Sequence, residues 1–112
     1  MTTYKVIHAG KRDGFEIQFE FSNESLPLTE TLDCELFDCD ELAREIDQGD
    51  LAYFTVTCVA KINEVRLGSA SLGACLYDRE EEFLADDYAA DLESEAINEA
   101  KQSIGRIVER VA

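Results

Sequence analysis

Apolar and polar residues alternate with a period of two in much of the first half of the chain, which predicts β-strands with one buried face. The clearest alternation covers residues 15–22, and a second covers residues 53–62. Both segments are rich in β-branched and aromatic residues, as strands usually are. The residues predicted to fill the core are Phe15, Ile17, Phe19, Phe21, Phe54, Val56 and Ile62, whereas Glu16, Gln18, Glu20 and Ser22 are expected to face water.

Two hairpins follow from these strands. Residues 10–14, which include two glycines, are predicted to form the turn of the first hairpin. Residues 62–65 are predicted to form the turn of the second, whose returning strand ends near Tyr77. With a regular register across this turn, Cys58 is expected opposite Ser69.

A helical signal follows each hairpin. Asp38 and Glu41 have the spacing of a capping box, so a helix is expected to begin there and to end at Gly49. The same spacing of Asp78 and Glu81 predicts a short helix after the second hairpin.

The longest helix is predicted to begin at residues 86–87 and to continue to the end of the chain. Its apolar residues recur every three or four positions, which is the pattern of one buried helical face. They are Leu92, Ala96, Ile97, Ala100, Ile104, Ile107, Val108 and Val111. This face is long enough to cover a sheet.

The predicted order of elements is ββαββα, and the expected fold class is α+β. Two hairpins and the helices that follow them pack most simply as an antiparallel sheet of about four strands with the helices on one face. At 112 residues the chain is expected to form a single domain, residues 1–112, with a core that needs no cross-links.

The charge of the chain limits its partners. Twenty-five acidic residues against ten basic ones give a formal net charge of −15. This charge argues against direct binding to nucleic acid or to an anionic membrane, because such binding needs Lys and Arg to replace the cations on the phosphates. A partner protein with a basic surface fits instead. No signal peptide and no apolar run of membrane-spanning length is found, so a soluble, cytoplasmic protein is expected.

No set of residues with the spacing of a catalytic or metal site is found. The four cysteines, Cys34, Cys39, Cys58 and Cys75, form no CxxC pair, and a zinc site is therefore not expected. Reducing cytosol would keep them as thiols, so no disulfide is expected either. The single histidine, His8, is assigned a structural or surface role. Without a phosphate-binding or dinucleotide motif, the chain is expected to be non-enzymatic and to hold no cofactor.

Carboxylates form the one pattern that points toward a function. Four of them recur at every fourth residue of the long helix, which places them on one face about 6 Å apart. They are Asp87, Asp91, Glu95 and Glu99. A second candidate group lies in the acidic stretch between residues 30 and 50. Its members are Asp38, Asp40, Glu41, Glu45 and Asp47.

Two interpretations of these carboxylates are open. In the first, they form a solvated face and favourable helix N-termini, and the charge serves only solubility, as in an acidic orphan domain or an oligomeric interaction protein. In the second, they form an anionic surface for a basic partner. The oligomeric state is left open by the sequence, with a homodimer among the alternatives.

In its charge, its small α+β size and its stripe of four helical carboxylates, the chain resembles the short acidic inhibitor proteins of phages and plasmids. These proteins block restriction enzymes or CRISPR complexes, some of them as mimics of DNA. The resemblance implies an inhibitor that occupies the basic nucleic-acid groove of a nuclease or a CRISPR complex. The stripe and the second carboxylate group would then be the partner-binding residues.

Overall fold

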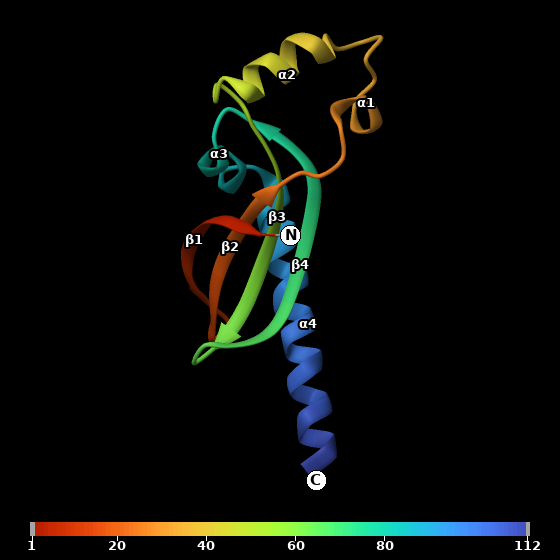
Figure 1. Cartoon of the computed structure of the whole chain (residues 1–112). Coiled ribbons are helices and arrows are strands. Elements are labelled where there is room, and N and C mark those ends of the chain that lie inside the picture. The colour runs from red at the N-terminus through yellow and green to blue at the C-terminus, as the bar shows by residue number, and fades with distance from the viewer. Residues whose placement is uncertain (1, 112) are drawn as a thin grey trace.

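The structure is a computed structural model that describes the backbone of residues 2–111 and the side chains of residues 2–106. Four strands form one antiparallel sheet in the order β1-β2-β3-β4, and the helices lie between the hairpins and after them (Figure 1). The elements are β1 (Thr3–Arg12), β2 (Phe15–Asn23), α1 (Leu28–Thr31), α2 (Cys39–Asp47), β3 (Ala52–Ile62), β4 (Val65–Tyr77), α3 (Glu80–Leu84) and α4 (Asp87–Val111). The predicted α+β fold with a four-stranded antiparallel sheet is confirmed.

The core lies between the sheet and α4, which runs along one face of β3 and β4 (Figure 1). Phe83 of α3 closes one end of this core, with edge-to-face ring contacts to Phe19 and Phe54. Six of the residues that the alternation predicts to fill the core are buried in the structure. They are Phe15, Ile17, Phe19, Phe21, Phe54 and Val56.

The prediction that Ile62 lies in the core is wrong, because 37% of the surface of this residue is exposed. It pairs with Val65 at the tip of the second hairpin, where Val65 is itself 57% exposed. The alternation gives the direction in which a side chain points, and burial also needs a covering layer.

Gly68 explains how closely α4 approaches the sheet. A Cβ atom at this position would lie 2.2 Å from the backbone oxygen of Ala96 and 2.4 Å from the backbone nitrogen of Ala100. These three residues are fully or almost fully buried, so the helix backbone rests directly on the strand. Leu92 and Ile97 are also buried, as predicted, whereas the side chains of Ile107, Val108 and Val111 lie outside the described residues.

Two bulges in β4 shift its register against β3. The turn at Asn63 and Glu64 was predicted correctly, but a bulge at Leu67, opposite the step from Ala60 to Lys61, moves Cys58 opposite Ala70 instead of Ser69. A second bulge, at residues 73–74, shifts the register by one more residue. Bulges of this kind insert an extra residue into one strand and are invisible to the alternation pattern.

The first hairpin has a shorter turn than predicted. β1 continues to Arg12, and only Asp13 and Gly14 lie between the strands. Gly10 lies within β1 instead, next to an irregularity in the pairing with β2.

The uncovered face of the sheet is less exposed than its polar residues suggest. Gln18 and Ser22 were expected to face water, yet both are buried, and so is Val59 on the same face of β3. The guanidinium of Arg66 on β4 binds the carboxylate of Glu20 on β2 through two hydrogen bonds of 2.8 and 3.1 Å. Glu20 pairs with Thr57 and Arg66 with Lys61, so this ion pair crosses β3 at Val59 and covers that side chain.

The starts of the two short acidic helices differ in how they are capped. Asp38 caps α2 as predicted, because its carboxylate accepts the backbone N–H of Glu41 at 3.1 Å. Gly49, with φ +83°, follows the end of this helix. The capping box predicted at Asp78 is wrong, since Arg79 holds the N-cap position of α3 without a side-chain cap. The acidic residues in the first turn of α3 still stabilise the helix, because they lie at the positive end of its dipole.

We call residues 24–50 the lobe. It contains α1 and α2, which lie beyond one end of the sheet (Figure 1), and α2 buries none of its side chains. Tyr53 of β3 anchors the lobe, because its hydroxyl donates to the backbone oxygen of Leu26 at 3.0 Å and lies 2.7 Å from the hydroxyl of Thr31. These polar contacts attach the lobe to the sheet, and Leu28 of α1 is the one buried side chain in residues 24–50.

Cys34 and Cys39 are joined by a disulfide bond within the lobe. The expectation that no disulfide forms is wrong for this pair. The two residues lie five positions apart across a tight loop, and their Cα atoms are 5.5 Å apart, which is an ordinary spacing for a disulfide. Cys58 and Cys75 remain free and buried, as expected.

Candidate protein-binding surfaces

The four carboxylates of the long helix form a surface that we call the α4 acidic face: Asp87, Asp91, Glu95 and Glu99. All four are exposed, and Asp91, Glu95 and Glu99 each directly precede one of the buried residues Leu92, Ala96 and Ala100. On the helix they therefore flank the buried stripe, about 100° away from it. An α-helix has 3.6 residues per turn, so each step of four residues also rotates the side chain by about 40° around the helix. The predicted stripe therefore winds across about 120° of the helix surface and does not form a straight row.

No residue of the α4 acidic face has a cationic partner among the described side chains. Six basic side chains pair with carboxylates elsewhere, mostly where they join separate elements of the fold. The pairs are Lys5 with Glu80 and Glu81, Arg12 with Glu93, Arg44 with Glu41, Lys61 with Glu64, Arg66 with Glu20, and Lys101 with Asp13. The negative charge of the α4 acidic face is thus left to solvent or to a partner.

The five predicted carboxylates near α2 have different roles in the structure. Asp38 caps the helix and Glu41 pairs with Arg44 at 3.0 Å, so both have a structural function. Glu45 is half-buried. Asp40 and Asp47 are exposed and line a groove together. These last two are exposed and can contact a partner without loss of a hydrogen bond or ion pair among the described side chains.

The groove lies between α2 and the chain that leads from β2 into α1, and its volume is about 440 Å³. Leu26, Ala43, Ile46 and Tyr53 contribute apolar surface to it. Ala43 lies three residues after Asp40 and four before Asp47, so these three share one face of α2. The result is an apolar groove with carboxylates along one side.

Large apolar side chains are exposed around this groove. Leu26 is 49% exposed, and the disulfide-closed loop presents Leu36 and Phe37, which are 78% and 51% exposed. Sequence reasoning missed these residues because they lie in a stretch without a clear period. One signal in the sequence could have indicated them. Large apolar residues and carboxylates occur together in a segment that has neither the period of a helix nor that of a strand.

The structure does not bring the two carboxylate groups together. α4 lies along one face of the sheet, whereas α2 lies beyond the end of the sheet (Figure 1). The chain therefore presents two separate acidic surfaces, and one of them includes an apolar groove.

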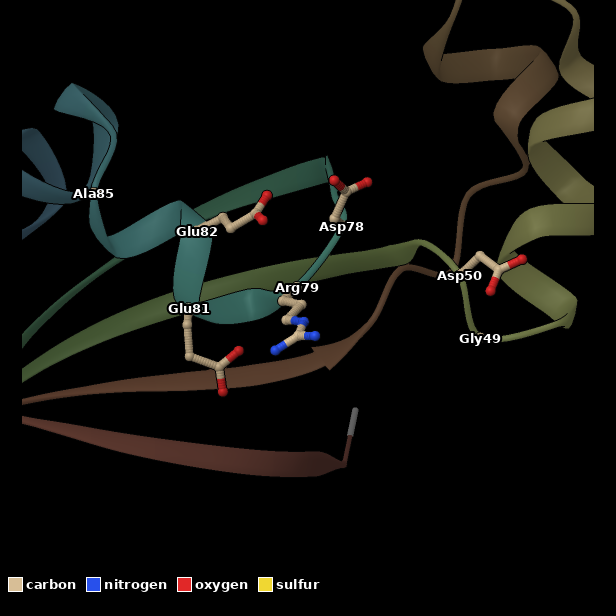
Figure 2. A pocket seen from close by; sticks show the side chains of 7 residues that line it. All are labelled: Gly49, Asp50, Asp78, Arg79, Glu81, Glu82 and Ala85. Carbon is tan, nitrogen blue, oxygen red and sulfur yellow. The ribbon is translucent and has the colours of Figure 1, made fainter.

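An open pocket of about 750 Å³ lies between the lobe and α3 (Figure 2). Asp50, Asp78, Glu81 and Glu82 line it together with Arg79. In Figure 2 the carboxylates of Asp50, Glu81 and Glu82 point in different directions. Among the residues that the structure describes, no group of three or more His, Cys, Asp or Glu side chains could hold a metal ion.

The remaining candidates for chemistry are the free thiols and the histidine. Burial raises the pKa of Cys58 to about 12, with a smaller contribution from Glu93. Burial likewise raises the pKa of Cys75 to about 11. Both thiols stay protonated at neutral pH, and a protonated thiol is a poor nucleophile. His8 is exposed on β1.

In comparisons with family models, curated proteins and solved structures, none matches this chain. Within the described residues, no helix has both the length and the apolar character that a membrane crossing requires.

Proposed function

We propose that this chain is a non-enzymatic binding protein whose α4 acidic face occupies the basic, nucleic-acid-binding surface of another protein. A nuclease or a CRISPR complex is the proposed class of target, and blocking its groove is the proposed effect. The observation that supports this function is the lack of any cationic partner for the four exposed carboxylates among the described side chains.

Like charges four residues apart on a helix cost a few tenths of a kcal/mol per pair. A single Lys at Asp91 or Glu95 would replace repulsion by attraction, so the present arrangement is not the most stable one. A surface retained for solubility alone needs no such concentration of one charge, because charge spread over the molecule serves equally well. A surface that binds a basic groove does need it, since complementary potentials set the rate and the specificity of association.

The experiment is a native-gel assay with purified restriction endonucleases and RNA-guided nuclease complexes. The expected result is a complex that weakens steeply as salt rises, because charges across a wet interface are screened. The parent chain should also compete with DNA for the nuclease. A target whose DNA binding is unaffected at a tenfold excess of the chain is not inhibited in this way.

A matched pair of variants separates a local surface from general charge. The first double variant, Asp91→Lys with Glu95→Lys, changes the α4 acidic face. The second, Asp78→Lys with Glu82→Lys, makes the same change of net charge at two exposed positions elsewhere. We expect the first pair to weaken binding by more than tenfold and the second by less than twofold. Equal effects of the two pairs would support the alternative, in which the charge serves solubility only.

A further inference from the structure

The lobe makes up about a quarter of the chain but carries most of the net negative charge. Residues 24–50 contain ten carboxylates and a single basic residue, Arg44, so they hold a net −9 of the total −15. The groove between Leu26 and α2 lies in this environment, and Asp40 and Asp47 flank its apolar surface.

The groove continues toward the disulfide-closed loop. A second hollow, lined by Leu36 and Phe37, shares the residues Thr29, Cys39 and Asp40 with the groove. Apolar side chains are thus accessible along the length of the lobe, from Leu26 at one end to the loop at the other. Isolated apolar residues are common on surfaces, whereas adjoining hollows that contain several large apolar side chains are a candidate binding site.

The loop is held in place before any partner arrives. The disulfide between Cys34 and Cys39 closes it, and the cap from Asp38 to Glu41 fixes its junction with α2. Tyr53 holds the opposite wall through Leu26. An apolar surface that is already ordered loses less conformational entropy on binding, which favours affinity.

We propose that this groove binds a short segment of a partner protein in which one or two large apolar side chains are flanked by Lys or Arg. The apolar side chains would enter the groove, and the basic ones would meet Asp40 and Asp47. The charge of the lobe excludes nucleic acid and anionic lipid as occupants. It also opposes a second copy of this chain, which itself carries a net −15. The inference is independent of the α4 acidic face.

The test uses two fluorescent heptapeptides of equal charge and the full chain, with its disulfide intact, in about 150 mM salt. One has two lysines on each side of Leu-Phe-Gly, and the other has Ser-Ser-Gly in the centre. Fluorescence anisotropy should show that the Leu-Phe peptide binds at least tenfold more tightly, because partial burial of two large apolar side chains supplies a difference of this size. Equal affinities, or no binding of either peptide up to 1 mM peptide, would overturn the proposal.

Variants of the chain locate the site. Leu26→Ser removes apolar surface at an exposed position and should weaken the Leu-Phe peptide about tenfold. Asp40→Asn with Asp47→Asn should weaken it severalfold, whereas Asp91→Asn with Glu95→Gln, which removes the same charge from α4, should change it less than twofold. The thermal midpoint of each variant checks that it is folded. If the two charge pairs act alike, the groove is not the site.

The failure of this proposal and the failure of the proposed function are distinguishable. If the peptides do not bind, the result of the nuclease assay with the Lys variants still stands, since that assay depends on α4.

The alternative occupant of the groove is a second copy of this chain. Light scattering across a range of protein concentrations tests for a dimer. A dimer that Leu26→Ser abolishes would assign the groove to a second copy and overturn the partner segment.

Discussion

The carboxylate of Glu24 accepts the backbone N–H of Ala74 at 2.6 Å, at the second bulge of β4. Ala74 has φ +55° and no partner residue on β3, so Glu24 supplies the acceptor that the strand pairing does not. The same carboxylate accepts the hydroxyl of Thr55 at 2.8 Å and the N–H of Leu26 at 3.1 Å. One side chain thus joins β3, β4 and the start of the lobe.

Glu24→Gln should lower the free energy of unfolding at pH 7 by about 1–2 kcal/mol, because a hydrogen bond to a charged group is worth about 1.5–3 kcal/mol and the partial exposure of Glu24 reduces that value. The bond from Ala74, followed by smaller effects, holds the pKa of Glu24 below its ordinary value. A lowered pKa means that this stabilisation is complete above a pH of about 4.3 and is lost as the pH falls through the lowered pKa. Urea unfolding at a series of pH values measures the difference, with the exposed Glu30→Gln as the control. A difference that grows on acidification would contradict the assignment.

Gly68→Ala should destabilise the protein by about 1–3 kcal/mol, the usual cost of an added methyl group in a filled core. The new Cβ would meet the backbone of Ala96 and Ala100, which cannot move without displacing α4. Gly105→Ala on α4 is the control, because, apart from the adjacent helix backbone, no described atom lies within 4 Å of a Cβ at this position. That change should raise stability by up to about 1 kcal/mol. Thermal unfolding that shifts in the same direction for both variants would contradict the close packing of α4.

The cysteines should fall into two classes in an alkylation experiment followed by mass spectrometry. Without reductant, the native protein should take up almost no iodoacetamide at pH 8, because Cys34 and Cys39 are bonded and the pKa values of Cys58 and Cys75 are raised by burial. Unfolding without reductant should add two labels, and unfolding with reductant should add four. Four labels without reductant would show that the disulfide is absent.

Glu95→Lys should stabilise the fold, although it adds no contact to the core. Lys at this position would face Asp91 and Glu99 at a spacing of four residues in either direction, and each new ion pair is worth about 0.2–0.5 kcal/mol. A thermal midpoint that rises in low salt, by less in high salt, is the expected result. An unchanged thermal midpoint at low salt would mean that the carboxylates of the α4 acidic face do not destabilise the helix by repulsion.

Much of the fold was predictable because it depends on local patterns. The alternation around Phe19 and Phe54 gave the inward face of two strands, and the spacing of Asp38 and Glu41 gave the start of α2. Exposure of the α4 carboxylates followed from the buried stripe at Leu92 and its neighbours. Each of these features depends on residues within a few positions of one another.

Features that depend on contacts between distant segments were not predictable. The bulge at Ala74 needs the acceptor of Glu24, which lies fifty residues earlier in the chain. Val59 lies on the face expected to be polar, and its burial depends on the ion pair between Glu20 and Arg66 from two other strands. The groove of the lobe also depends on how α2 is placed against the chain before α1. Spacing along the sequence carries no information on such pairs.

The lack of any buried side chain on α2 has a consequence for how this chain can change over generations. Substitutions of exposed residues usually alter folding free energy by no more than about 0.5 kcal/mol. Exposed positions of α2 that make no structural bond, such as Asp40, Ala43 and Asp47, can therefore accept new residues while the hairpins and α4 keep their packing. The lobe can acquire a new specificity by mutation without first acquiring a more stable scaffold.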